Sequence, residues 1–273
     1  MKTLLVPTDF SPVALNAAYY AAEIASLTGA RILLLHVYAI PAIPSETMVI
    51  LPITQLEEGS LEVLDSIKGE IQQKHNGKLK IECRTLGGLP SLEIDALAKE
   101  SNADLVVMGM MGAGYLTEKL VGSVTSTLLM RAKCPVLAIH KNIKFKSLKK
   151  ILLACDYSEI QNKTILDPLK ELAEMFKSHI YILNVAKDTE TLPTAEQAAA
   201  GIKLNHSLEA FDHSFHSWIN EDIIDGLNQF AEINMIDLVV MVPHRHNLLQ
   251  RIFHEPNTKR MAFHTSTPLL ALH

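Results

Sequence analysis

The stretch DLVVM occurs twice in the chain, at residues 104–108 and again at residues 237–241. Sliding the sequence by 133 residues pairs 104–140 with 237–273 without a gap, and 11 of the 37 aligned positions are identical. The two aligned segments end on CPVLAIH and TPLLALH. Self-similarity of this kind indicates a duplicated structural unit.

A second match links the beginnings of the two copies. KTLLVPTDFS at residues 2–11 aligns with KKILLACDYS at residues 149–158, sharing Lys, Leu, Asp and Ser. A length of 273 residues also suits two domains of about 100–150 residues each. We therefore predict a tandem duplication, with one domain over residues 1–142 and a second over residues 148–273.

Within each copy, short apolar runs alternate with segments of helical pattern. Continuous apolar strands separated by helices are typical of a parallel sheet that is covered on both faces. The predicted fold class is α/β: two tandem doubly wound, Rossmann-like domains, each of about five strands. The expected strands are 3–8, 31–39, 79–85, 103–110 and 134–140, then 150–155, 180–186, 213–218, 237–242 and 268–272; the expected helices are 12–29, 55–75, 90–102 and 123–132, then 158–177, 194–210, 221–234 and 256–264.

The composition of the chain argues against a membrane protein and against a nucleic-acid-binding protein. Apolar residues make up 48% and charged residues 20% of the chain, and no apolar run reaches the ~18 residues of a membrane span. The net charge of -5 offers no basic field for nucleic acid. The first residues, MKTLLVPTDFS, lack the apolar core of a signal peptide. We expect a cytoplasmic protein without membrane or nucleic-acid partners, in which Cys83, Cys134 and Cys155 are small buried hydrophobes.

The segment after the first DLVVM carries regularly placed glycines. Gly109 and Gly112 are followed, nine residues later, by Gly122 and Ser123, which open a predicted helix. Glycine lets backbone amides approach an anion closely, and a helix N-terminus favours phosphate. Glycines at such a loop are also ordinary turn residues, so the spacing alone leaves both interpretations open. A P-loop and a dinucleotide GxGxxG motif are both absent from the sequence.

The glycines belong to a larger set of motifs, and this set is more specific than the glycine spacing alone. The strand VVMG, the spacing G-x2-G-x9-G-S, the closing CPVLAI and the opening LVPTDFS together resemble the universal stress protein family. The resemblance extends over nearly the whole chain, as a tandem two-domain member. Family members that carry the glycine motif typically bind ATP, so the resemblance implies an ATP or other adenine-nucleotide site, with Mg2+ as a possible companion.

The resemblance also implies roles for individual positions. It places Pro7, Thr8 and Asp9 on the adenosine side and Val37 against the adenine. Asp9 has an alternative interpretation as a cap or turn residue, and Met110 and Met111 are favoured as core or loop residues. The implied nucleotide contacts are completed by Met108, Gly109, Gly112, Gly122, Ser123, Val124 and Thr125.

The second copy departs from the motif. Val242, Arg245, Glu255 and Pro256 stand at the positions of Gly109, Gly112, Gly122 and Ser123. A carboxylate and a proline that lacks an N–H donor are unsuited to phosphate. We therefore expect one nucleotide site per chain, in the first domain.

The degenerate loop of the second copy is rich in histidine. His244, His246 and His254 could hold zinc, or together with Arg245 and Arg251 an anion. The alternative is a solvated loop or an interface. His206, His213 and His216 form another group, but 213 and 216 lie on opposite faces of any strand that contains both.

The resemblance implies a nucleotide-dependent signalling or protective protein in the stress response. The alternatives are a slow ATPase, for which no general base is evident, and an interaction scaffold without nucleotide. We expect the two domains to pair through their final strands, and leave open a homodimer and a protein partner. Ser11 and Ser158 are interpreted as helix caps, and Asp104 and Asp237 as turn residues.

Overall fold

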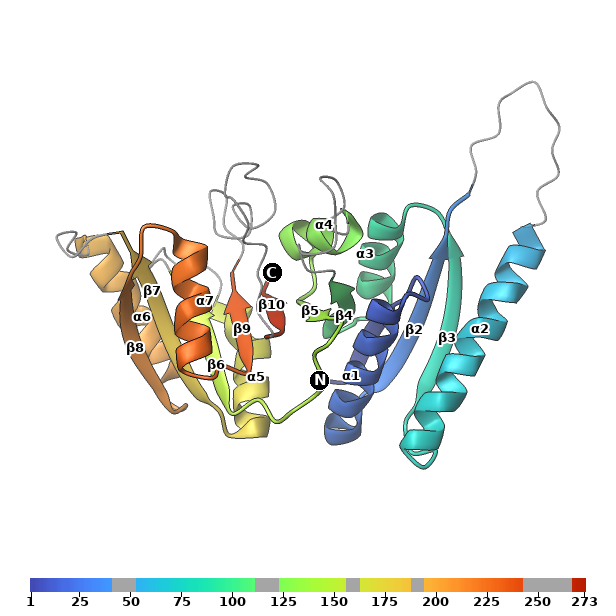
Figure 1. The fold of residues 1–273 in the computed structure, drawn as a ribbon, viewed down its shortest axis with the longest axis horizontal. Coiled ribbons are helices and arrows are strands. Elements are labelled where there is room, and N and C mark those ends of the chain that lie inside the picture. Colours follow the sequence, from blue (N-terminus) through green and yellow to red (C-terminus); the bar gives the residue numbers. More distant parts are fainter. Residues whose placement is uncertain (41–52, 111–122, 156–162, 188–193, 243–266) are drawn as a thin grey trace, which may run out of the picture.

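The computed structural model shows an α/β protein built on one ten-stranded sheet with helices on both faces (Figure 1). It describes every residue except 41–52, 111–122, 156–162, 188–193 and 243–266. Two five-strand units follow one another along the sheet, in the order β3-β2-β1-β4-β5-β10-β9-β6-β7-β8. The predicted fold class is confirmed, whereas the exact domain boundaries remain a prediction.

The first unit has the strand order β3-β2-β1-β4-β5, and all its neighbouring strands are parallel. This is a doubly wound order, in which the order of the strands along the sheet reverses between β1 and β4 while all of them run in the same direction. Its elements are β1 (Thr3–Pro7), α1 (Pro12–Thr28), β2 (Arg31–Tyr38), α2 (Ile53–Lys74), β3 (Ile81–Gly87), α3 (Pro90–Glu100), β4 (Leu105–Met110), α4 (Ser123–Arg131) and β5 (Val136–His140).

The second unit repeats this order with parallel strands β8-β7-β6-β9-β10. A 3-10 turn, η2, precedes its first described helix, which is shorter than the expected helix over 158–177. The expected helix 256–264 and the Ser158 cap lie outside the described residues. The elements are β6 (Lys150–Ala154), η2 (Lys163–Leu166), α5 (Asp167–Phe176), β7 (His179–Ala186), α6 (Ala195–Leu208), β8 (His213–Ile219), α7 (Ile223–Ile233), β9 (Leu238–Met241) and β10 (Leu269–Ala271).

The two units are joined through their last strands. β5 and β10 pair antiparallel, with Leu270 opposite Leu137 and Ala271 opposite Val136. All four side chains are buried. The expectation that the repeats pair through CPVLAIH and TPLLALH is confirmed, and the result is one continuous sheet and not two separate ones.

Helix α1 shows how local sequence sets an element's bounds. The Ser11 hydroxyl accepts a hydrogen bond from the Ala14 N–H, and Pro12 occupies the first turn, where its missing N–H costs nothing. Gly29 ends the helix with φ 72°, a left-handed conformation that glycine adopts readily. Between these ends, the helix buries a row of alanines against the sheet.

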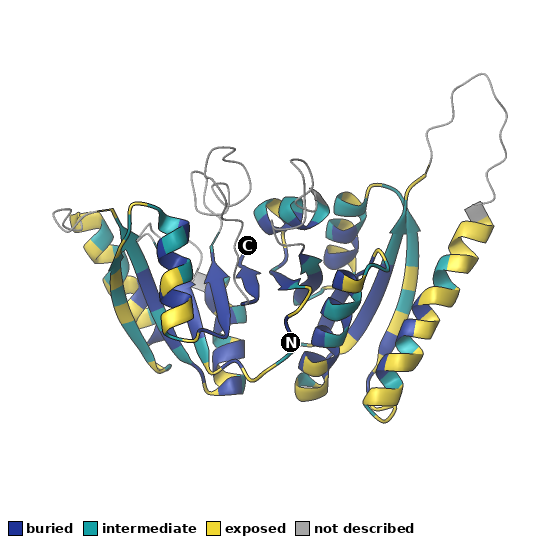
Figure 2. Cartoon of the chain, viewed as in Figure 1, coloured by how far each residue is buried: buried dark blue, intermediate teal, exposed yellow. Residues whose placement is uncertain are grey.

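The apolar core forms two layers, one on each face of the sheet. Helices α1, α2, α5 and α6 cover one layer. Helices α3, α4 and α7 cover the other. Figure 2 shows the central strands buried and the outer helix faces exposed. None of the described helices combines the length and the hydropathy of a membrane span.

Asp104 and Asp237 do more than the turn role predicted for them. The Asp104 carboxylate accepts hydrogen bonds from the backbone N–H groups of Lys2 and Thr3, at 2.6 and 2.8 Å. Asp237 accepts one from the N–H of Lys150 at 2.9 Å. Each aspartate thus fixes the start of the neighbouring strand, β1 or β6, because otherwise these donors would lack a strand partner.

The cysteines are free thiols, as far as the described residues show. Cys134 is buried as expected, whereas Cys83 and Cys155 are half-buried. Burial raises the pKa of the Cys134 thiol to about 12 and, with the nearby Asp65 carboxylate, that of Cys83 to about 11. Both thiols are therefore protonated and unreactive at neutral pH.

Candidate functional site

The candidate site lies where the strand order reverses, at the carboxyl ends of β1 and β4. Leu5 pairs with Val106 in the parallel ladder. Continuing that register by two residues places Pro7 beside Met108. The loops that leave β1 and β4 therefore emerge next to each other, in the crevice where doubly wound folds bind ligands.

The turn from β1 to α1 is held by a dense set of hydrogen bonds. The Thr8 N–H donates to the Leu35 carbonyl at 2.8 Å, and the Thr8 hydroxyl accepts from the Phe10 N–H at 3.0 Å. The next residue, Asp9, accepts from the Ser11 N–H through Oδ1 at 3.0 Å. Of these two side chains, Thr8 is buried and Asp9 is exposed to solvent.

Phe10 of this turn and His36 of β2 also meet here and were not predicted as site residues. Phe10 has φ 65°, in the left-handed region that a bulky residue rarely adopts. Its ring stacks on the His36 imidazole with centroids 4.2 Å apart, and His36 Nδ1 bonds the Thr8 carbonyl at 2.8 Å. The stack holds the backbone in this conformation. Only the adjacency of β1 and β2 brings the two rings together, so the sequence carries no local signal for the pair.

The second unit preserves the backbone part of this turn. The Cys155 N–H donates to the Leu183 carbonyl at 2.9 Å, as Thr8 does to Leu35. The Asn184 side-chain amide donates to the Cys155 carbonyl at 3.0 Å, in the place of His36 and Thr8. The duplication therefore extends to single hydrogen bonds, with the Asn184 amide in place of the His36 imidazole.

Gly109, at the end of β4, has a packing reason to be glycine. A Cβ at this position would lie 2.8 Å from the backbone carbon and oxygen of Val13 and from its Cγ1. Such distances are closer than carbon atoms approach, so α1 can pack here only against a residue without a side chain. The sequence interpretation, close approach to an anion, is thus not the sole explanation for this glycine.

Thr125, in the first turn of α4, is tied back to the same glycine. Its hydroxyl donates to the Gly109 carbonyl at 2.9 Å, and the side chain is 7% exposed. The bond joins the end of β4 to the first turn of α4, on either side of the glycine segment. Because the hydroxyl has only one proton, Thr125 can meet a further ligand here only as an acceptor.

Val37 and Met108, which are predicted to line the base, share one face of the sheet with Val124, which is predicted for the phosphate cradle. Val37, Met108 and Val124 all belong to the layer that packs beneath α3 and α4. Met108 is buried, whereas Val37 and Val124 are half-buried. All three residues thus lie in the core layer that α3 and α4 cover in the first unit.

The structure describes only some of the remaining residues that were predicted to bind a ligand. Ser123 is the first residue of α4, as expected for a helix N-terminus. Gly112 and Gly122 lie outside the described residues. So do His244, His246 and His254, together with Arg245, Glu255 and Pro256 of the degenerate loop. No group of three metal-ligating side chains occurs within the part of the chain that the structure describes.

Comparison with known proteins identifies the family. A family model described as the universal stress protein family matches residues 1–140. The chain belongs to the universal stress protein family. Universal stress protein MJ0531 of Methanocaldococcus jannaschii is 36% identical over 149 residues, covering 51% of this chain and 82% of the relative. Universal stress protein MJ0577 of the same organism is 27% identical, covering 51% and 95%.

A solved structure matches the whole of this universal stress protein. It is a universal stress protein from Archaeoglobus fulgidus, with a TM-score of 0.74, covering 99% of this chain and 97% of that one. At 18% identity, the match shows the fold alone. It indicates that the ten-strand arrangement is found in another member of the family.

The described residues suit an adenine nucleotide. The Asp9 carboxylate is exposed and uses Oδ1 for the turn, and among the described residues no group bonds its Oδ2. That oxygen is therefore available to a ribose hydroxyl or to a phosphate-bound cation. Val37, which is half-buried, supplies apolar surface of the kind that lines a base, whereas Met108 is buried. With a nucleotide bound, α4 would present the positive end of its dipole to the phosphates.

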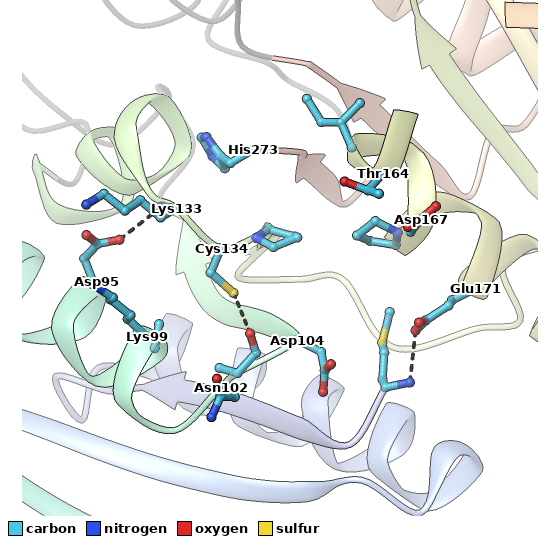
Figure 3. A pocket seen from close by; sticks show the side chains of 16 residues that line it. Asp95, Lys99, Asn102, Asp104, Lys133, Cys134, Thr164, Asp167, Glu171 and His273 are labelled. Carbon is cyan, nitrogen blue, oxygen red and sulfur yellow. Dashed lines mark hydrogen bonds and ion pairs between the residues drawn. The ribbon is translucent and has the colours of Figure 1, made fainter. Parts of the chain in front are cut away.

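A separate cavity of about 420 Å³ opens at the opposite end of the strands, between the two units (Figure 3). The carboxylates that line the cavity bond to other groups of the protein. Asp104 bonds the start of β1, Asp95 accepts from the Lys133 N–H at 3.1 Å, and Glu171 pairs with the amino group of Met1 at 2.9 Å. The cavity also contains His273, whose pKa burial lowers to about 4. It is distinct from the predicted nucleotide site.

Proposed function

We propose that this universal stress protein binds an adenine nucleotide, ATP in the first place, at the carboxyl ends of β1 and β4. Binding there would couple nucleotide occupancy to signalling or protection in the stress response. The first unit carries the glycine motif and the second does not, so one site per chain follows. The switch-point position of both loops and the family membership support the proposal.

One observation carries most weight: the β1–α1 turn is rigidly bonded and leaves a single carboxylate oxygen without a partner among the described residues. The turn uses the polar groups of Thr8 internally and leaves the Asp9 side chain exposed. A preorganised turn avoids the entropy cost of ordering itself around a ligand. Asp9 is therefore the residue whose change should separate ligand binding from folding.

The first experiment asks what the purified protein carries. The protein is denatured, and the released small molecules are separated and identified by mass spectrometry. AMP, ADP or ATP at a fixed ratio to protein supports the proposal. A nucleotide-free preparation that also fails to bind added ATP at millimolar concentration contradicts it and favours the interaction scaffold.

The second experiment uses Asp9→Asn in a calorimetric titration with ATP. Asparagine keeps an oxygen for the Ser11 N–H, so the turn should survive while the charge is lost. We expect ATP affinity to fall by about tenfold or more, which corresponds to about 1.4 kcal/mol. Glu57→Gln, on the exposed face of α2, is the matched control. Equal affinity in the Asp9 variant and the wild type would remove Asp9 from the site.

Phosphate release distinguishes a binder from a slow ATPase. Among the described residues at this turn, the groups that could act as a general base are Asp9 and His36, and the His36 ring is already stacked on Phe10 and bonded through Nδ1 to the Thr8 carbonyl. We therefore expect ATP to remain intact over hours of incubation with the protein. Steady release of phosphate that disappears in Gly122→Glu, which introduces the residue aligned in the second unit, would establish hydrolysis instead.

A further inference from the structure

A chain of four polar side chains lies on the outermost strands of the second unit, at the end away from the nucleotide site. Asp212 Oδ2 lies 2.9 Å from His179 Nδ1. His179 Nε2 lies 2.7 Å from the Ser214 hydroxyl oxygen. The same oxygen lies 2.7 Å from His216 Nε2. A carboxylate, an imidazole and a hydroxyl are thus linked in the order that activates a nucleophilic serine.

Strand register explains how distant residues meet here. β7 and β8 are parallel, with Ile180 opposite His213 and Tyr181 opposite Ser214. His179 therefore lies beside Asp212 and diagonal to Ser214, on the same face of the sheet. Diagonal neighbours on one face are within reach of long side chains such as histidine. His213, which alternates to the other face, takes no part and bonds Asn205 of α6 instead.

One proton arrangement satisfies all three contacts while both rings are neutral. His179 Nδ1–H donates to the Asp212 carboxylate, which leaves Nε2 as an acceptor for the Ser214 O–H. His216 then donates its Nε2–H to the Ser214 oxygen. Burial and the neighbouring His179 lower the pKa of His216, which favours its neutral form. The serine proton therefore points at the ring that is oriented to receive it.

The first unit shows that the scaffold does not require this network. By strand register, Arg31, Glu82 and Arg84 occupy the positions of His179, Ser214 and His216. There they form ordinary surface ion pairs, with Arg84 Nε 2.9 Å from Glu82 and Arg31 at 3.9 Å. Charged residues can thus occupy the equivalent positions on these two strands. The hydrogen-bonded histidine–serine set is a property of the second unit.

Ser214 is half-buried, and the residues that extend the network from it reach solvent. The Asp212 side chain is 79% exposed and that of His179 is 28% exposed, so solvent reaches this end of the network. On the inner side, the His216 ring stacks on Tyr181 at 5.4 Å and contacts Phe230 at 5.2 Å. An aromatic wall beside an open carboxylate suits a small uncharged molecule with an aromatic or alkyl group.

A backbone donor is also available at the open edge. The Ile180 N–H bonds the Asp212 carbonyl, and the Asn220 N–H bonds the Ala186 carbonyl, so the even-numbered residues of β8 direct their peptide groups toward β7. The alternation of a parallel ladder then directs the Phe215 N–H away from β7. No described strand pairs with β8 on that side. The carbonyl oxygen of a substrate at this edge could accept a hydrogen bond from the Phe215 N–H, next to Ser214.

We propose that Ser214 is an activated nucleophile for small carboxylic esters, with His179 as general base and Asp212 as a positioning residue. The serine oxygen bonds the ester carbonyl carbon while its proton passes to His179 Nε2. The bond to the alcohol oxygen breaks, and the alcohol leaves with that proton. Water, activated by the same ring, then releases the acid and restores the serine, so ester and water give acid and alcohol.

Covalent labelling of the full-length protein tests this directly. A fluorophosphonate forms an oxygen–phosphorus bond with an activated serine while fluoride leaves. We expect one adduct per chain by intact mass, and peptide mapping should place it on Ser214. This readout needs no substitution and so does not depend on how any variant folds. Absence of an adduct, or an adduct confined to other residues, overturns the proposal.

Variants then test the roles of the neighbours. His179→Gln should slow labelling by about 100-fold or more, as expected for loss of a general base. Asp212→Asn should slow it too, and Asp212→Glu, which restores a carboxylate, should recover part of the rate. Ser217→Ala, an exposed serine on the opposite face of β8, should label like the wild type. Labelling of Ser214 at an unchanged rate in His179→Gln would contradict the assigned base.

Turnover is measured with 4-nitrophenyl acetate, following release of the alcohol above the uncatalysed rate. Wild-type protein and Ser217→Ala should turn over the ester, and Ser214→Ala should fall to background. Circular dichroism and the thermal midpoint check that each variant is folded. Equal turnover by folded Ser214→Ala and the wild type would overturn the proposal. Because this site is remote from the β1–α1 turn, its failure would leave the nucleotide proposal intact.

Discussion

The Thr125 hydroxyl donates a hydrogen bond to the Gly109 carbonyl at 2.9 Å, across a sequence separation of 16 residues. The bond closes the base of the glycine segment by joining the end of β4 to the first turn of α4. It is nearly excluded from solvent, because Thr125 is 7% exposed. The position of the α4 N-terminus relative to β4 is therefore fixed without a ligand.

Replacing Thr125 tests this connection. Thr125→Val keeps the shape of the side chain but leaves the Gly109 carbonyl without its donor. We expect a loss of about 1–3 kcal/mol in the free energy of unfolding, the usual cost of an unsatisfied buried acceptor. Thr125→Ser keeps the hydroxyl and should lose less. Urea denaturation measures both variants, and equal stability of Thr125→Val and the wild type would show that the bond contributes nothing.

Gly109→Ala tests the contact between β4 and α1. The added methyl group would lie 2.8 Å from three atoms of Val13, two of them backbone. We expect a loss of about 1–3 kcal/mol from overpacking. Val13→Ala removes only the Cγ1 contact and should rescue only part of this loss.

The matched control for Gly109→Ala is Gly59→Ala. Gly59 lies within α2, and nothing lies within 4 Å of an added Cβ there. The same chemical change should stabilise the protein by up to about 1 kcal/mol, because alanine favours the helix. A Gly109 variant as stable as the Gly59 variant would mean that α1 moves aside without cost.

The junction between the units should be sensitive to Leu270. Its side chain is fully buried opposite Leu137, in the antiparallel pair that joins β10 to β5. Leu270→Ala should cost about 2–5 kcal/mol in unfolding free energy. Leu92→Ala, at a position 63% exposed on α3, should change stability by less than about 0.5 kcal/mol. Similar losses at the two positions would argue against a packed junction.

His273 should make stability depend on pH. Burial lowers its folded pKa from 6.5 to about 4, so the unfolded chain binds the proton more readily. The resulting stabilisation is complete above pH 6.5 and is lost as the pH falls toward 4. His273→Leu removes this titration, so its unfolding free energy should fall less between pH 7 and pH 4.5. Parallel pH profiles of the variant and the wild type would contradict the assignment.

Much of the fold follows from local sequence. Ser11, Pro12 and Gly29 mark the ends of α1 by cap chemistry alone, and the repeat of DLVVM identifies equivalent strands. The family motif adds the switch point between β1 and β4. These features are local or periodic, so a single sequence contains them. The pairing of β5 with β10 also follows, because the last strand of each repeat would otherwise be left with an unpaired edge.

The contacts between distant residues could not be predicted in this way. His206, His213 and His216 were grouped by sequence proximity, yet Ser214 is bonded both by His216 and by His179, which is 35 residues away on β7. The stack of Phe10 on His36 likewise depends on strand adjacency. For Gly109, the sequence suggested an anion, whereas the structure adds a steric reason in Val13. A side-chain neighbour on another strand is fixed by register, and register depends on the whole sheet.

The central claim is that one unit of the duplicated fold binds nucleotide and the other does not. Equilibrium dialysis of the full-length protein against radiolabelled ATP tests it most directly, after any bound nucleotide has been removed. We predict saturation at one ATP per chain and a marked loss of binding in Gly122→Glu. Saturation at two equivalent sites per chain, or no binding at all, would contradict the account.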